Sequence, residues 1–175
     1  MDTAAEQMTP GMPPIDSTQV GHVARGERAS DNQLVGVHRL LLATDLSSAS
    51  ERATDEAIRL AVEFSAELVV LSIIDPGRLR LPGGRFLRRV DQERARIETS
   101  VQKLVSRARL AGARATFLVW EGEPAEAILA ASDAENVDVI VLGSHGRGLL
   151  GRLVLGSIST RVSEQARCQV LVVAA

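Results

Sequence analysis

The sequence predicts an α/β domain built on a doubly wound, five-stranded parallel sheet with helices on both faces. Two observations lead to this prediction. Five short apolar runs show no alternation with polar residues, as is typical of strands buried on both faces. Segments with helical periodicity separate these runs, which indicates β-α-β units. In such sheets ligands bind beyond the carboxyl ends of the strands, where the strand order reverses, so we expect function to reside there.

The first apolar run, residues 40–43, predicts a buried strand that ends at two polar residues. Ser48 and Glu51 then have the spacing of a capping box, which predicts the start of the first helix. Alanine, leucine and phenylalanine recur on one face of that helix. A second strand is expected at residues 68–74, which turn residues follow.

The segment at residues 78–89 is basic and interrupted by glycines, and it predicts a loop. A long amphipathic helix follows it and is expected to stop near Gly112, because glycine is common just after a helix. The remaining elements are a strand at 115–120, a helix from Pro124 to about residue 135, a strand at 137–142, a glycine-rich loop at 143–156, a helix, and a last strand at 170–173.

The amino-terminal segment, residues 1–36, contains several prolines and no sustained apolar period. It predicts a disordered tail ahead of a domain at residues 37–175. Asp2 and Glu6 stand where a secretory signal needs positive charge, and every apolar run is far shorter than the roughly 20 residues that cross a bilayer. We therefore expect a cytoplasmic protein that does not associate with membranes.

Charge and cysteine content exclude further classes of function. The net charge is −2, and the basic residues, all Arg except Lys103, are interspersed with acids. Nucleic-acid binding is therefore not expected. Cys168 is the only cysteine, which excludes an intrachain disulfide and a multi-cysteine metal site. Its apolar neighbours indicate a role in packing.

The glycine-rich segment after the fourth strand is the richest candidate for chemistry. Glycines allow the backbone to approach an anion, while free amides and the positive end of a helix dipole stabilise phosphate. A surface loop with a serine cap is the alternative interpretation, but the strand-loop-helix context favours phosphate binding. The segment contains Gly143, Gly146, Gly148, Gly151 and Gly156, and then Ser157 at a helix start.

Two common phosphate-binding motifs do not account for this segment. A P-loop requires GxxxxGK followed by Ser or Thr, but the only lysine is Lys103. Residues 146–151 spell GxGxxG, as in dinucleotide-binding folds. The acidic residue that should follow about twenty positions later, at the end of another strand, is missing.

The spacing of the glycines resembles that of the universal stress protein family, in its ATP-binding branch. That branch carries Gly, two residues, Gly, nine residues, then Gly and Ser or Thr, which falls here on Gly143, Gly146, Gly156 and Ser157. The segments ATDLS, VVLSIID, EGEPAEAIL, DVIVLGSHGRG and CQVLVV are also similar to the family, over residues 39–174. The family commonly has Pro in place of Gln169 and often His in place of Ser72.

The resemblance implies a fold of the adenine nucleotide alpha hydrolase type. It implies ATP as the ligand, with Mg²⁺ or Mn²⁺ as the metal that could accompany it, and a homodimer formed through the C-terminal strand. The base and sugar would lie near the ends of the first two strands, and the phosphates on the glycine-rich loop. The implied ATP-binding residues are Ala43, Thr44, Asp45, Ile73, Gly143, Ser144, His145, Gly146, Arg147, Gly156, Ser157, Ile158 and Ser159.

The side chains of this set have different expected roles. Asp45 would accept hydrogen bonds from the sugar or base, with helix capping near Ser48 as its alternative. Ile73 would contribute shape only. Arg147 matches phosphate geometry, although an exposed Arg in a loop is equally consistent with solvation. His145 could touch phosphate or a metal, but no second ligand stands at metal-binding spacing.

Hydrolysis of ATP requires a base that positions water, and the loop offers only His145 for that role. We therefore expect a regulatory ATP-binding protein of the stress response rather than an enzyme. A slow ATPase or other nucleotide hydrolase, and a family member that acts only through protein contacts, are the alternatives.

Overall fold

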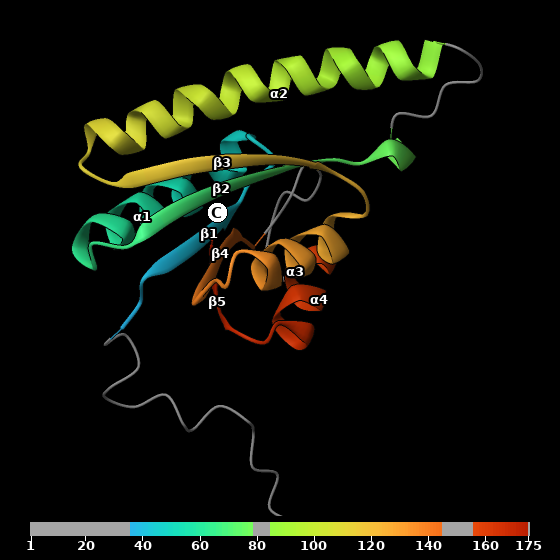
Figure 1. Ribbon diagram of the computed structural model, residues 1–175. Coiled ribbons are helices and arrows are strands. Elements are labelled where there is room, and N and C mark those ends of the chain that lie inside the picture. The colour runs from blue at the N-terminus through green and yellow to red at the C-terminus, as the bar shows by residue number, and fades with distance from the viewer. Residues whose placement is uncertain (1–35, 79–84, 145–155, 175) are drawn as a thin grey trace, which may run out of the picture. The chain divides into compact units, whose positions relative to one another are not determined.

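The computed structural model describes residues 36–78, 85–144 and 156–174. In these residues five parallel strands form one sheet in the order β3-β2-β1-β4-β5 (Figure 1). All pairings between neighbouring strands are parallel. The predicted strands are confirmed to within two residues at each end. They are β1 (Arg39–Ala43), β2 (Glu67–Ile74), β3 (Arg114–Glu121), β4 (Val139–Gly143) and β5 (Gln169–Val173).

Helices cover both faces of the sheet, which confirms the predicted doubly wound α/β fold. The helices α1 and α2 pack on one face, and α3 and α4 pack on the other (Figure 1). None of the helices in the described residues is both long and apolar enough to cross a membrane. The helical elements are the 3-10 turn η1 (Ser48–Ser50), α1 (Glu51–Glu63), the 3-10 turn η2 (Pro76–Arg78), α2 (Arg85–Leu110), α3 (Pro124–Ala134) and α4 (Ser157–Gln165).

The core consists of two apolar clusters, one on each face of the sheet. Successive residues of a strand point to opposite faces. Leu41 therefore joins the cluster under α3 and α4, while Leu40 and Leu42 join the cluster under α1 and α2. All three leucines are almost fully buried. Cys168 is half-buried against the cluster under α3 and α4, and burial raises the pKa of its thiol.

The predicted loop at residues 78–89 is wrong in its second half, because α2 begins at Arg85. No glycine or proline follows Gly84 until Gly112, and arginine, leucine, glutamine and glutamate all favour helix. Val90 is buried seven residues before Ile97, so the apolar stripe of the helix extends back to the residue directly after the segment predicted as loop. Residues 79–84 lie outside the described part of the chain.

The predicted capping box is also wrong. Ser48 lies in η1, and α1 begins only at Glu51, with Ser50 at its N-cap and no side-chain hydrogen bond to the cap. Serine side chains can bond to nearby backbone instead of capping a helix. Here the hydroxyl of Ser50 donates to the carbonyl of Ser47 at 2.8 Å. A tight turn therefore replaces the first turn of the expected helix.

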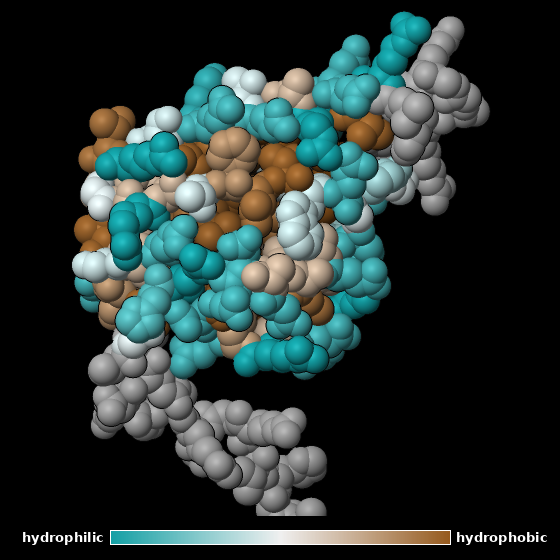
Figure 2. Space-filling view, in the orientation of Figure 1, coloured by the Kyte–Doolittle hydropathy of each residue, from teal (hydrophilic) through white to brown (hydrophobic). Residues whose placement is uncertain are grey.

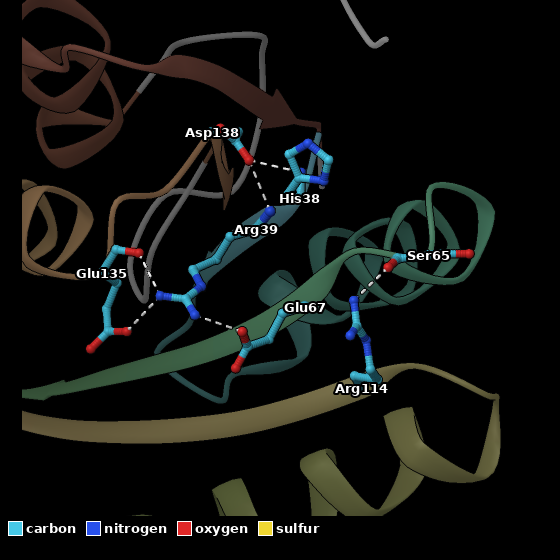
Figure 3. Close-up of polar contacts among 7 residues, drawn as sticks. All are labelled: His38, Arg39, Ser65, Glu67, Arg114, Glu135 and Asp138. Atoms are coloured by element: carbon cyan, nitrogen blue, oxygen red, sulfur yellow. Dashed lines mark hydrogen bonds and ion pairs between the residues drawn. The ribbon is translucent and has the colours of Figure 1, made fainter. Parts of the chain in front are cut away.

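A polar network ties the amino-terminal ends of β1, β2 and β4 together (Figure 3). One carboxylate oxygen of Asp138 accepts from the backbone N–H groups of His38 at 2.8 Å and Arg39 at 2.9 Å. The guanidinium of Arg39 donates to Glu67 at 2.7 Å and to the carbonyl of Glu135 at 2.7 Å. The network lies at the edge of the sheet opposite to the carboxyl ends of the strands, so it supports the fold rather than the candidate site.

The outer edge of β3 is covered by two arginines of α2. Arg109 donates through two nitrogens to the carbonyl of Ala115, at 2.7 and 3.0 Å. Arg94 donates to the carbonyl of Val119 at 3.3 Å and pairs with Glu121. These carbonyls point away from β2, where a further strand would otherwise pair. Side chains that occupy edge groups in this way oppose pairing with another sheet.

Candidate functional site

The strand order reverses between β1 and β4. After β1 the chain passes to α1 on one face of the sheet, and after β4 it passes to α4 on the other face. The backbone N–H of Thr44 still bonds to Leu71 of β2 at 3.0 Å, and that of Ser144 bonds to Val173 of β5 at 2.8 Å. The two chain segments therefore separate directly beyond these residues. This is the position at which open α/β sheets bind ligands.

The turn after β1 fixes the carboxylate of Asp45. One of its oxygens accepts from the backbone N–H of Ser47 at 3.0 Å and from the Ser47 hydroxyl at 2.6 Å. Between them Leu46 has a φ of +60°, a left-handed conformation that is uncommon for a residue other than glycine. Asp45 therefore stabilises this turn, while the N-cap of α1 is Ser50. The side chain of Asp45 remains exposed.

A chain of buried hydroxyl groups supports this turn from below. The hydroxyls of Thr44 and Ser50 lie 3.0 Å apart, and the N–H of Leu46 donates to Thr44 Oγ1 at 3.0 Å. The hydroxyl of Thr54 donates to the carbonyl of Ser50 at 3.0 Å. All three hydroxyl residues are buried. Satisfied buried networks of this kind rigidify their surroundings, so the position of Asp45 is held by both its own turn and the layer beneath it.

The end of β4 and the start of α4 are joined by the backbone. The N–H of Gly156 donates to the carbonyl of Ser144 at 2.8 Å. A Cβ atom at Gly156 would lie 3.2 Å from that same oxygen, a tight contact that requires the oxygen to shift by a few tenths of an ångström. Gly156 and Gly143 therefore lie on neighbouring segments, although twelve residues separate them. Of these twelve, residues 145–155 lie outside the described part of the chain, including the predicted His145, Gly146 and Arg147.

The first turn of α4 presents backbone amides without a side-chain cap. Gly156 is the N-cap, and among the described residues no side chain accepts a hydrogen bond from the first-turn N–H groups as a cap. Ser157 is exposed and Ile158 is half-buried, whereas Ser159 is buried. The Ser159 hydroxyl donates to the carbonyl of Gly156 at 2.9 Å and lies 3.5 Å from that of Ser144. Its side chain therefore holds the turn, and Ser157 is the hydroxyl that faces solvent.

An ion pair links the start of α3 to α4 on the same side of the sheet. Arg161 donates to Glu123 at 2.9 Å and to Glu126 at 2.8 Å. The hydrogen bond to Glu126 raises the pKa of Arg161. Glu123 also accepts from the backbone N–H of Glu126 at 3.0 Å and so caps α3. Exposed ion pairs contribute little to stability, but this one joins two helices whose first turns both border the strand ends.

The structure thus places most of the predicted residues together. Ala43 ends β1 and is followed by Thr44 and Asp45, and Gly143 ends β4 and is followed by Ser144, beside Gly156 to Ser159. Ile73 lies near the end of β2. Sequence reasoning missed Leu46, Ser47 and Arg161. The positive φ of Leu46 leaves no signal in the sequence, and the DLS spacing gives only a weak indication of the Asp45–Ser47 turn. The described residues contain no group of three or more His, Cys, Asp or Glu that could hold a metal.

Comparison with known proteins identifies the family. The model of the universal stress protein family matches residues 36–174. The chain belongs to this family. A universal stress protein of Thermus aquaticus is 36% identical over 135 residues, which cover 77% of this chain and 96% of the relative. One from Methanocaldococcus jannaschii is 31% identical over 143 residues, which cover 77% of this chain and 81% of the relative.

Solved structures of the family share the fold. The universal stress protein UspA from Lactobacillus plantarum superposes with a TM-score of 0.72 at 24% identity, covering 78% of this chain and 97% of that protein. A universal stress protein solved in complex with cAMP has a TM-score of 0.60 at 25% identity, covering 79% and 97%. The five-stranded parallel sheet with helices on both faces is therefore the fold of this universal stress protein.

Proposed function

We propose that this universal stress protein binds ATP at the carboxyl ends of β1, β2 and β4, and that it acts as a regulatory binding protein rather than an enzyme. The first turn of α4 carries the proposal. Its N–H groups at residues 157–159 have no acceptor within the helix. The Gly156 to Ser144 bond holds them beside the end of β4. Such a turn favours phosphate through its amides and its dipole.

The nucleoside is assigned to the other strand ends. Asp45, with its carboxylate oriented by Ser47, would accept hydrogen bonds from the ribose hydroxyls, and Ile73 would contact the base. His145, Gly146 and Arg147 complete the proposed phosphate set from the sequence pattern. The relative solved with cAMP supports an adenine nucleotide as the class of ligand.

The proposed metal finds few protein ligands. With no cluster of three candidate ligands in the described residues, Mg²⁺ or Mn²⁺ would be held mainly by the phosphates of the nucleotide and by water. The residues present therefore fit a nucleotide site better than a dedicated metal site.

Calorimetric titration with ATP tests the proposal. Gly156→Val should weaken binding most, because the Cβ atom alone would meet Ser144 O at 3.2 Å. Ser157→Ala and Asp45→Ala should each weaken it about ten- to hundredfold, the effect of one hydrogen bond to a charged group. Ser163→Ala, exposed on the same helix, is the matched control and should leave the affinity unchanged.

Failure of the wild-type protein to bind ATP would overturn the proposal and favour a member that acts through protein contacts. If a nucleotide copurifies with the protein, whether it is ATP or ADP distinguishes a binding protein from a hydrolase. ATP recovered unchanged after incubation supports a binding protein, whereas conversion to ADP that Asp45→Ala abolishes would indicate a slow ATPase.

We also propose that two copies pair through β5. The N–H of Gln169 and the carbonyl of Val173 bond to the side of β4, so the backbone groups of Val170 and Val172 face outward. Residues 170–173 are half-buried and apolar. Analytical ultracentrifugation should show a dimer, and Val172→Arg should yield a monomer that remains folded.

A further inference from the structure

The strands β2 and β3 run on past the ends of their neighbours. The last residue of β1, Ala43, is opposite Leu71, and β4 ends one residue beyond the same level. β2 continues through residues 72–74, which pair with residues 119–121 of β3. At about 3.3 Å per residue, this β2–β3 extension projects about 10 Å beyond the end of β1. It forms one side of the region where the ligand is proposed to bind.

The extension carries an aromatic side chain next to a residue assigned to the base. Ile73 and Trp120 are register partners on adjacent strands, so their side chains point to the same face of the sheet. Both belong to the apolar cluster that includes Leu71 and Ala43. Leu71 is fully buried, whereas Ile73 and Trp120 are only half-buried. The apolar face therefore becomes accessible at the extension.

The molecular surface agrees with this geometry. Figure 2 shows hydrophobic surface over β2 and β3, beside the more polar surface of α2. A half-exposed indole within an apolar surface is well suited to stack on a planar ring. Two strand spacings, on the order of 10 Å, separate β2 from β4, where the phosphates would lie. A nucleoside triphosphate can span that distance.

We propose that Trp120 stacks on the purine base of the bound nucleotide. Together with Ile73 it would make the site prefer a ligand that carries an aromatic base over phosphate alone. This inference rests on the proposed nucleotide site and adds a residue that the glycine motif does not indicate. It requires that a nucleotide bound at the strand ends changes the environment of Trp120, whereas phosphate bound without a base does not.

The sequence offers a direct optical test, because Trp120 is its only tryptophan and the chain has no tyrosine. Titration with ATP should quench or shift the emission of Trp120, with the same dissociation constant that calorimetry gives. Tripolyphosphate, which lacks a base, should leave the emission unchanged. Unaltered emission at an ATP concentration that calorimetry shows to be saturating would overturn the role of Trp120 and leave the proposed nucleotide site intact.

Three variants make the test quantitative. Trp120→Leu should weaken ATP binding about ten- to hundredfold, the typical effect of removing an aromatic stacking partner, and leave tripolyphosphate binding unchanged. Trp120→Phe should retain most of the affinity. Leu118→Ala is the matched control, since Leu118 is half-buried two residues earlier on the same face of β3. It should lower the melting temperature without changing the affinity.

Each outcome of these titrations decides between the two proposals. Wild-type affinity in folded Trp120→Leu, or an equal loss in Leu118→Ala, would refute a stacking role. If Trp120→Leu does not fold, the wild-type emission and the Trp120→Phe affinity decide the matter. Absence of any ATP binding to the wild-type protein would refute the stacking role together with the nucleotide site.

Discussion

Removal of the Asp138 carboxylate should destabilise the protein without affecting ligand binding. The side chain accepts two backbone hydrogen bonds, from Arg39 at 2.9 Å and His38 at 2.8 Å. A hydrogen bond to a charged group contributes about 1.5–3 kcal/mol when it is shielded from water. His38 is exposed, so water can replace much of its bond, whereas Arg39 at the start of β1 is half-buried. We therefore expect Asp138→Ala to cost about 2–3 kcal/mol.

For a domain of this size that loss lowers the melting temperature by about 6–12 °C. Asp138→Asn should lose less, because the amide oxygen still accepts. Asp133→Ala is the control, since it removes the same charge from an exposed pair with Arg167 at 3.4 Å and should shift the free energy of unfolding by less than about 0.5 kcal/mol. Thermal unfolding followed by circular dichroism provides the measurement. A melting temperature of Asp138→Ala equal to that of Asp133→Ala would refute the reasoning.

The remaining predictions concern the tail, the thiol and the sheet edge. A chain that begins at Gly36 should fold and keep a melting temperature within about 5 °C of the full-length protein, because the family match and the main compact unit both start there; a larger drop would show that the tail contributes to packing. Cys168 should react with Ellman's reagent at about pH 8 more slowly than free cysteine and speed up in denaturant, because its raised pKa lowers the thiolate fraction; equal rates in both conditions would contradict this. Arg94→Ala combined with Arg109→Ala should increase light scattering by large assemblies, while Arg96→Ala, an exposed pair on the same helix, should not.

The sequence predicted the sheet well because central parallel strands depend on local composition. The runs at β1 and β4 are uninterrupted apolar segments, and burial on both faces admits few other structures. The end of the helix near Gly112 was also predicted from a local feature. The φ of +98° at Gly112 is one that glycine adopts readily, and glycine is common just after a helix. The resemblance to the universal stress protein family is confirmed by the family match, and it also singled out Gly143, which lies at the end of β4.

The details of the site depend on contacts that one sequence does not reveal. The capping box at Ser48 had the right spacing, but competing hydroxyl bonds from Ser47 and Ser50 favour a turn. The start of α2 at Arg85 was missed, although Val90 near its beginning is buried. Trp120 appears in the sequence as an ordinary strand residue, because its place beside Ile73 follows from the register between β2 and β3.

The two arginines along β3 bear on how far association between copies can proceed. A parallel sheet has two edge strands. A protein with both edges open could add further copies at either edge, as growing fibres do. Here α2 covers the edge at β3 through Arg94 and Arg109. Pairing of β5 with β5 would then cover the open edge of each copy, and the resulting dimer would have no open sheet edge to which a further copy could pair. A single long helix would thus make the assembly finite.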